Sequence, residues 1–222
     1  MKRLLSLLLC TALAIIAPGC ATKIEKRDLN VSELRDELMI AESDKMKITL
    51  ISGEREDPFV IDGTPGKRTP FTVVTIAPRG FIDDAAFAYV VYVGAEKFEG
   101  QFSEHPYKST YSVELPMRAE STATVTVTSD GYAENFEMKS VKTAETISAS
   151  VALETAEIRL KDRVKELTEN GELAAEIYVR FTENPISADG GYYWYVAFVP
   201  EKYTVYAVLI DPVTKEIVAV RE

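Results

Sequence analysis

Between Met46 and about Ala152, short runs of alternating apolar and polar residues are separated by turn-forming residues. The clearest run, Thr122 to Thr128, reads Thr-Ala-Thr-Val-Thr-Val-Thr and is followed by the turn residues Ser129-Asp130-Gly131. Successive side chains of a β-strand point to opposite faces, so this alternation indicates strands with one buried face. Regularly spaced strands without a long helical period predict an antiparallel sandwich.

Further strands are expected around this run. They are predicted near Ile48–Leu50 and at Phe71–Ile76, Phe87–Val93, Tyr111–Leu115 and Phe136–Val141, and Ile147, Ala149 and Val151 are expected to close the region. The nearly continuous run Phe87–Val93 suits a central strand. The stretch from Thr124 to Tyr132 resembles the late strands of bacterial immunoglobulin-like (Ig-like) surface modules. This resemblance implies an Ig-like β-sandwich over residues 45–152.

Residues 153–222 have a different pattern. An apolar residue recurs every three or four positions at Leu153, Ala156, Leu160, Val164 and Leu167, which predicts a helix with one apolar face. Asn170-Gly171 is a typical helix stop. Three strand candidates follow, at 174–182, 192–200 and 203–220, the last broken at Asp211-Pro212. A helix that precedes an antiparallel meander predicts a small α+β domain, in which the helix covers one face of the sheet.

The end of the chain resembles a known family. From Tyr206 to Val218, a hydrophobic strand leads into Asp211-Pro-Val-Thr214 and a final strand, which is similar to the end of PepSY-type domains. Lys215 stands where the family has a glycine, although a positive φ angle costs lysine more than glycine. The resemblance covers about residues 154–222 and implies a PepSY/cystatin-like fold. It also implies an extracytoplasmic module that binds peptides or modulates a peptidase, and no catalytic residues.

The N-terminal residues predict where the protein resides. Lys2 and Arg3 precede an apolar segment from Leu4 to Ala17, which is shorter than the roughly 20 apolar residues that a membrane-spanning helix needs. This pattern predicts a secretory signal peptide over residues 1–19. Its end, Pro18-Gly19-Cys20, resembles the lipobox of bacterial lipoproteins, in which the cysteine is acylated and becomes the mature N-terminus. The resemblance implies that Cys20 is the lipid-attachment residue.

The alternative is an ordinary signal peptide whose removal leaves Cys20 as a free thiol. Cys10 lies in the segment that would be removed, so Cys20 would then have no intramolecular partner in a secreted product. Lipidation explains this solitary cysteine better. We therefore expect an extracytoplasmic protein that its lipid anchors to a bacterial membrane, at the outer membrane or the cell surface depending on the host.

Residues 20–44 are expected to form the lipid anchor and a solvated tether, because the stretch is mostly polar. The alternative is a short helix, with Asn30 or Ser32 as its N-cap and with Leu34, Leu38 and Ala41 on one face.

The composition excludes several classes of function. Thirty-five acidic residues against 25 basic ones give a net charge of −10, which argues against a nucleic-acid partner. The single histidine, His105, has no second histidine with which to form a metal site or a catalytic group. The acidic groups Asp83-Asp84 and Glu54, Glu56 and Asp57 lack the spacing of a calcium loop and are interpreted as solvated loops. We expect no enzyme, no metal and no cofactor.

One aromatic cluster is a candidate binding site. Tyr192, Tyr193, Trp194 and Tyr195 are consecutive, so on a strand Tyr192 and Trp194 would lie on one face and Tyr193 and Tyr195 on the other. An exposed aromatic face could stack on a sugar or grip a peptide. The alternative is that these rings pack in the core or between the two domains.

The sequence thus predicts a lipid-anchored, extracytoplasmic binding protein that engages a protein or peptide. One alternative is a carbohydrate-binding surface lipoprotein that uses the aromatic face. Another is a structural subunit of an envelope assembly.

Overall fold

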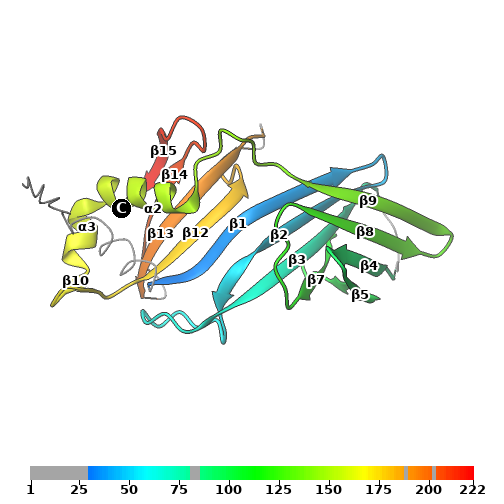
Figure 1. Ribbon diagram of the computed structural model, residues 1–222, viewed down its shortest axis with the longest axis horizontal. Coiled ribbons are helices and arrows are strands. Elements are labelled where there is room, and N and C mark those ends of the chain that lie inside the picture. Colours follow the sequence, from blue (N-terminus) through cyan, green and yellow to red (C-terminus); the bar gives the residue numbers. More distant parts are fainter. Residues whose placement is uncertain (1–29, 81–85, 188–189, 202–203) are drawn as a thin grey trace, which may run out of the picture.

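The computed structural model describes residues 30–80, 86–187, 190–201 and 204–222. The predicted signal peptide, Cys20 and Asp83-Asp84 lie outside the described residues. Most of the described chain is antiparallel β-structure, as the sequence predicts, and one long twisted sheet runs through the elongated molecule (Figure 1). None of the described helices is long and apolar enough to cross a membrane.

The described residues of the first part of the chain form nine strands. They are β1 (Val31–Glu42), β2 (Met46–Glu56), β3 (Arg68–Pro78), β4 (Ala88–Val93), β5 (Glu96–Gln101), β6 (Ser103–Glu104), β7 (Tyr111–Leu115), β8 (Thr122–Ser129) and β9 (Tyr132–Ser140). In the second part, the structure describes two helices and six strands. They are α2 (Ala149–Arg159), α3 (Lys161–Glu166), β10 (Thr168–Glu169), β11 (Glu172–Leu173), β12 (Glu176–Glu183), β13 (Tyr192–Glu201), β14 (Thr204–Ile210) and β15 (Ile217–Arg221).

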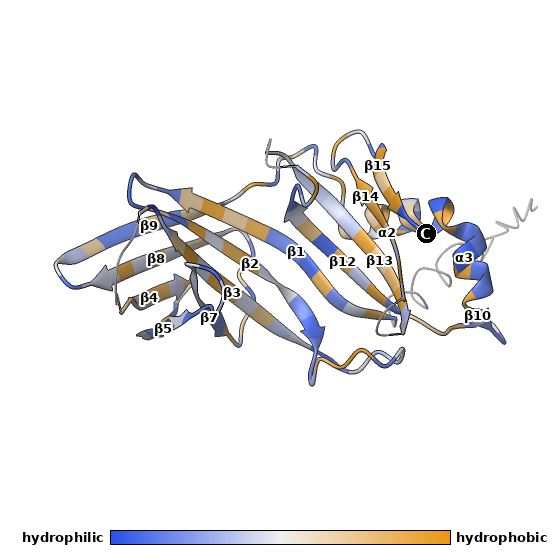
Figure 2. Cartoon of the chain, turned by 180° about the vertical axis from the view of Figure 1, so that it is seen from behind, coloured by the Kyte–Doolittle hydropathy of each residue, from blue (hydrophilic) through white to orange (hydrophobic). Residues whose placement is uncertain are grey.

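The first nine strands form a two-layered sandwich. One layer has the order β1-β2-β3-β7-β6 and the other has the order β9-β8-β4-β5, and a short pairing of β9 with β1 joins them. The strands carry alternating hydrophobic and hydrophilic residues (Figure 2). The inward-facing residues, among them Leu50, Val74, Val91 and Val125, form one buried core between the layers. The predicted sandwich is therefore confirmed, and so is the central place of β4, which lies between β5 and β8.

The strand order of residues 45–152 agrees with that of an immunoglobulin sandwich. In that fold, the first, second, fifth and fourth strands (A, B, E and D) form one sheet, and C, F and G belong to the other. Counted from β2, the layer β2-β3-β7-β6 corresponds to A-B-E-D, and the layer β5-β4-β8-β9 corresponds to C′-C-F-G. The connectivity is therefore consistent with the Ig-like expectation, and β1 is an additional strand that pairs with β2 at the edge of the first layer.

The second part of the chain is a helix-covered antiparallel meander. Strands β12, β13, β14 and β15 pair in sequence order, and α2 contacts β12, β13 and β14. The predicted apolar helix face is confirmed for Ala156, Leu160 and Val164, which are buried against the strands. The predicted order of one helical region followed by a meander is therefore correct.

The helical region differs from the prediction at its boundaries. It begins at Ala149, four residues earlier than predicted, and the Ser148 side chain caps it by accepting a hydrogen bond from Val151 N. Residues 149–151 are therefore helical and do not close the sandwich as a strand. Leu160, whose backbone departs from helical geometry, separates α2 from α3. Asn170-Gly171, predicted as the helix stop, forms the turn between β10 and β11, where both residues have a positive φ.

Residues 31–42 form a central strand, so both predictions for them, the solvated tether and the short helix, are wrong. The first half of β1 pairs in parallel with β12, from Val31 opposite Ile177 to Arg35 opposite Arg180. The second half pairs with β9, and β2 lies along the other edge of β1. This one strand therefore connects the helix-covered sheet to the sandwich.

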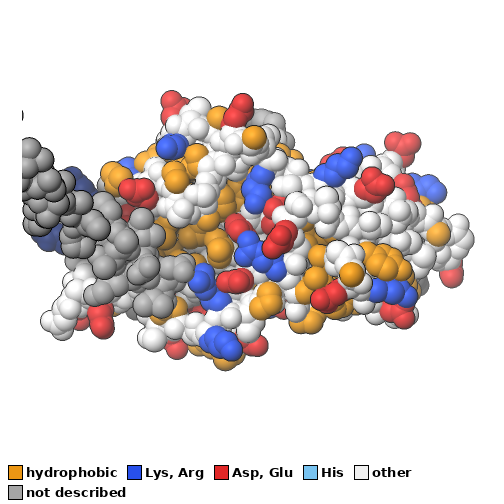
Figure 3. All heavy atoms as spheres, in the orientation of Figure 1, with side chains coloured by type: hydrophobic (Ala, Val, Ile, Leu, Met, Phe, Trp, Pro, Cys, Tyr) orange, Lys and Arg blue, Asp and Glu red, His pale blue; other side chains and the backbone are white. Residues whose placement is uncertain are grey.

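A bulge in β1 lies between its two halves. The register with β2 shifts between Leu34 and Glu37, and the backbone of Gly53 lies directly against this irregularity. A Cβ atom on Gly53 would stand 1.8 Å from the Leu34 carbonyl oxygen, so only glycine fits there. Asp36, in the bulge, and Glu37, beside it, form ion pairs with Arg118 (2.6 Å) and Lys142 (2.8 Å). Figure 3 shows charged side chains of both signs interspersed near the middle of the molecule, with hydrophobic side chains beside them.

Lys215 takes the conformation that the missing glycine would favour. Its φ is 66° in the turn between β14 and β15. The Asp211 carboxylate stabilises this turn because its Oδ1 accepts hydrogen bonds from Val213 N (2.9 Å) and Thr214 N (2.8 Å). These hydrogen bonds lower the pKa of Asp211.

Candidate functional site: the outer face of the C-terminal sheet

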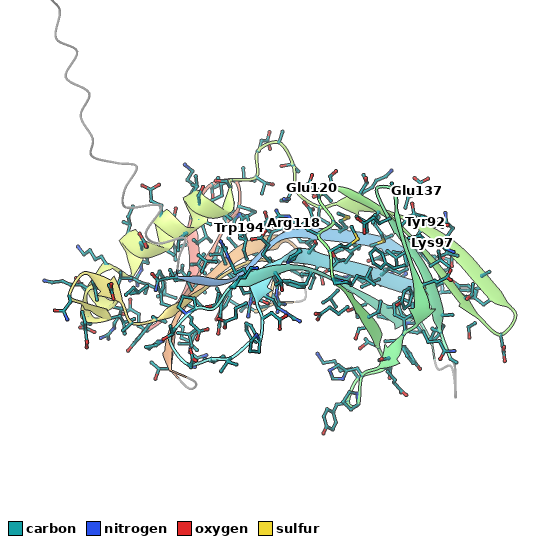
Figure 4. The ribbon with its side chains drawn as sticks, turned by 60° about the horizontal axis from the view of Figure 1, so that its bottom comes forward. Tyr92, Lys97, Arg118, Glu120, Glu137 and Trp194 are labelled. Carbon is teal, nitrogen blue, oxygen red and sulfur yellow. The ribbon has the colours of Figure 1, made fainter. Side chains whose placement is uncertain are left out.

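The predicted aromatic cluster is divided between two sides of β13, as the alternation predicts. Trp194 lies in the core on the helix side, where it is 1% exposed and its ring centroid is 5.1 Å from that of Phe181. Its Nε1 donates a hydrogen bond to the Ile147 carbonyl (3.1 Å), so the polar N–H group of the buried indole has a partner. In Figure 4, Trp194 lies beside α2, far from Tyr92, Lys97 and Glu137 at the other end of the molecule.

Tyr192 and Trp194 serve as packing residues between the two parts of the molecule. Both belong to a core that also includes Leu38 and Ile51 of β1 and β2. The neighbouring residue Leu50 faces the interior of the sandwich, so Ile51 points to its outside. The end of the β12–β13 hairpin therefore packs on the outside of the sandwich, and this corresponds to the packing alternative that the sequence left open.

The opposite side of the C-terminal sheet, which we call the outer face, combines tyrosines with small apolar residues. Tyr178, Ala197 and Ala207 lie next to one another across β12, β13 and β14 and form a small apolar cluster with Val199. Tyr195 is half-buried and packs against this cluster, and Tyr193 is half-buried as well. The helices lie on the other side, so a different element must cover these residues.

The loop between β2 and β3 covers part of the outer face. Ile61 packs against the apolar cluster, and the ring of Phe59 lies 5.8 Å from that of Tyr178. Phe59 and its neighbour Val60 are nevertheless 41% and 48% exposed. The loop thus closes one side of the face and presents apolar side chains to solvent.

The Glu176 carboxylate holds this loop. Glu176 is fully buried, and its Oε1 accepts hydrogen bonds from Asp62 N and Gly63 N, each at 2.8 Å. Its Oε2 accepts from the Tyr178 hydroxyl (2.9 Å). Burial, together with this contact to a carboxylate, raises the pKa of Tyr178, so the phenol stays neutral and continues to donate.

A second buried carboxylate lies at the base of the loop. Glu56 accepts a hydrogen bond from Gly66 N (2.7 Å) through Oε2, whereas its buried Oε1 has no partner among the described residues. Burial raises the pKa of Glu56; the Gly66 hydrogen bond opposes this shift, and the nearby Glu176 and Asp62 add to it. The interpretation of Glu56 as part of a solvated loop is therefore wrong, because the loop folds back over it.

Sequence reasoning missed Phe59 and Glu176 as candidate site residues. The Gly/Pro-rich segment Asp62-Gly63-Thr64-Pro65-Gly66 indicates a turn, but nothing in the sequence shows that this turn crosses to strands more than 110 residues away. A useful signal would have been the acidic residue Glu176 at the start of an otherwise apolar strand, because a buried carboxylate requires hydrogen-bond donors.

Metal ligands and the histidine do not contribute to this site. Within the described ranges, no group of three or more His, Cys, Asp or Glu residues could hold a metal ion. His105 lies in a turn, where its Nδ1 accepts a hydrogen bond from Tyr107 N (3.2 Å).

No family model, no curated protein and no solved structure matches this chain.

Proposed function

We propose that this chain is a lipid-anchored, extracytoplasmic binding protein of the bacterial envelope, and that it engages a protein or peptide through the outer face. The exposed apolar tip of the β2–β3 loop carries the proposal, because Phe59 and Val60 stay accessible and Phe59 lies beside Tyr178 of the apolar cluster. Accessible apolar side chains rimmed by polar groups are typical of protein interaction surfaces.

Two resemblances support the location and the class of partner. The lipobox-like residues Pro18-Gly19-Cys20 support an acylated N-terminus outside the cytosol. The helix and meander of residues 149–221, with a positive φ at Lys215, support the PepSY-like resemblance and with it a peptide ligand or a peptidase partner.

The structure counts against sugar stacking by the whole aromatic cluster. Trp194 is buried on the helix side, and a buried indole cannot offer its face to a carbohydrate. The outer face keeps Tyr193 and Tyr195, but its most exposed rim consists of Phe59 and Val60, which have no polar group to bind sugar hydroxyls.

The lipid anchor is tested by intact mass spectrometry of the full-length protein, extracted from membranes with detergent. We expect a chain that begins at Cys20 and carries fatty acyl chains. A Cys20→Ser variant should lose both the added mass and the membrane association. An unmodified cysteine in the wild-type protein would refute the anchor.

The binding function is tested by presenting the same detergent-extracted protein to a peptide array and to a glycan array. We expect it to retain a subset of peptides, and the Phe59→Ser, Val60→Ser double variant should lose them. Ile158→Ser is the matched control, because Ile158 is an exposed apolar residue on α2, away from the loop. Retention of glycans without peptides, or equal binding by the double variant, would refute the proposal.

A further inference from the structure

Three arginines lie together on the sheet where β12, β1 and β2 meet. The strand register places Arg35 opposite Arg180 and Glu33 opposite Arg55. We call Arg35, Arg55 and Arg180 the arginine patch. A cluster of basic residues is unexpected in a chain whose net charge is −10.

Two aromatic rings position the guanidinium groups. The Cζ atoms of Arg55 and Arg35 lie 4.8 and 6.0 Å from the centroid of the Phe71 ring, and Cζ of Arg180 lies 4.7 Å from that of Tyr178. Cation–π contacts of this kind restrain a flexible arginine and so reduce the entropy that it would lose on binding a ligand.

In the arginine patch, three guanidinium groups form ion pairs with two carboxylates, those of Glu33 and Glu114. Glu33, whose side chain is 1% exposed, accepts from Nε of Arg35 (2.7 Å) and from Nε of Arg180, so one carboxylate serves two guanidinium groups. Arg55 pairs with Glu114, whose side chain is 48% exposed. Such exposed ion pairs contribute little stability, and a ligand carboxylate can replace this one at low cost.

The patch is accessible. The side chains of Arg35, Arg55 and Arg180 are 31%, 29% and 27% exposed. Among the described residues, Arg35 donates a hydrogen bond through Nε alone, which leaves its terminal amino groups available. A guanidinium edge matches the two oxygens of a carboxylate. Arg35 and Arg55 repel each other across one ring, and an anion bound between them would relieve that repulsion.

We infer that the arginine patch binds a carboxylate-rich segment of a partner protein. This inference rests on the proposed function, because it names the chemistry of the peptide that the outer face receives. Tyr178 connects the patch to the loop, since its ring contacts both Arg180 and Phe59. A peptide with acidic residues beside an aromatic or aliphatic one would contact the arginines and Phe59 together, which a small free anion cannot do.

The test uses the full-length protein in detergent and two fluorescein-labelled peptides, one rich in glutamate with a single phenylalanine, the other with glutamine in place of each glutamate. We expect the acidic peptide to bind at least tenfold more tightly, and Arg55→Gln to abolish this preference while thermal unfolding shows an intact fold. Arg79→Gln is the matched control, because Arg79 pairs with the exposed Glu42 away from the patch. Its preference should equal that of the wild type.

Equal affinity of the wild type for both peptides, or an unchanged preference in Arg55→Gln, would overturn the inference. Displacement of the acidic peptide by an equal concentration of inorganic phosphate would also overturn it, because it would show a site for small anions. If peptides still bind and depend on Phe59, the proposed function stands without the inference. If no peptide binds in either experiment, both fail.

Discussion

The two faces of the C-terminal sheet are made by the same strands but from different kinds of residue. Along β13, Trp194, Val196 and Phe198 point to the helix side, and Tyr195 and Ala197 point to the outer face. The helix side is a core of large apolar groups under α2. The outer face includes two alanines, a valine and three tyrosines, and it is partly covered by a loop that one buried carboxylate holds in place.

Because of this difference, we assign the stability of the sheet mainly to its helix side and ligand binding to its outer face. The helix side gains free energy mainly from burying large apolar side chains, which leaves little for a ligand to contact. The cover of the outer face depends on a few hydrogen bonds from Asp62 and Gly63 to Glu176, and Phe59 stays exposed. We therefore expect substitutions on the helix side to change stability most, and substitutions on the outer face to change loop opening and binding.

The largest expected effect tests the helix side. Trp194→Ala should reduce the free energy of unfolding by about 3–5 kcal/mol, because it removes a fully buried indole and leaves a cavity. Denaturant unfolding measures this, and Trp194→Phe should lose less because a ring still fills the site. The fraction that remains folded should bind peptides as the wild type does. Lost binding with unchanged stability would mean that the indole is a ligand contact.

The second prediction tests the loop. Glu176→Ala leaves Asp62 N, Gly63 N and the Tyr178 hydroxyl without their acceptor, so it should cost about 1.5–3 kcal/mol. Hydrogen exchange should become faster at Asp62 and Gly63 and stay slow in the helix-side core. Glu176→Gln, which keeps an acceptor oxygen, should lose less. Uniformly faster exchange across both faces would contradict the separation of the two.

The sequence predicts most of the strands but not the strand that connects the two parts. Strands such as β8 show their alternation because one face is buried and the other exposed. Strand β1 lacks a visible alternation of apolar and polar residues for two reasons. A bulge shifts its register, and the adjacent residues Leu38 and Met39 belong to different cores. The spacing of Leu34, Leu38 and Ala41 therefore imitates a helix.

The outer face could not be predicted for a related reason. Glu33 and Arg35 look like solvated charges within a polar stretch, and their partner Arg180 lies 147 residues from Glu33 in the sequence. The alternation in β13 did predict which aromatic residues share a side. Which side is covered depends on where the β2–β3 loop folds, and this contact between distant segments has no local signal.

The third prediction concerns pH. The pKa of Glu56 is raised above its ordinary value of 4.5, so the folded state favours the neutral carboxyl. The stability that this group contributes is therefore full below pH 4.5 and is lost as the pH rises through the raised pKa. Glu56→Gln, which is neutral at every pH, should be more stable than the wild type at pH 7, and the difference should vanish in acid.

Thermal unfolding of both proteins between about pH 4 and pH 8 measures this difference, because that interval contains the raised pKa of a buried carboxyl group. Glu54→Gln, on the same strand, is the control for the removal of one negative charge. A stability difference that grows toward acid would mean that Glu56 is held in its charged form, and the account of the loop base would be wrong.

The smallest expected effect comes from a position that touches neither face. Lys215 adopts a φ of 66°, which strains a side chain with a Cβ atom but not glycine. Lys215→Gly should therefore raise the free energy of unfolding by about 0.5–1 kcal/mol, the strain relieved being partly offset by the greater freedom of glycine in the unfolded chain. Lys215→Ala keeps the Cβ atom and should bring no such gain.

Because the turn lies away from the β2–β3 loop, peptide binding and hydrogen exchange at Gly63 in Lys215→Gly should match those of the wild type. A change in either would mean that the outer face responds to global stability, and the distinction between the two faces would then fail.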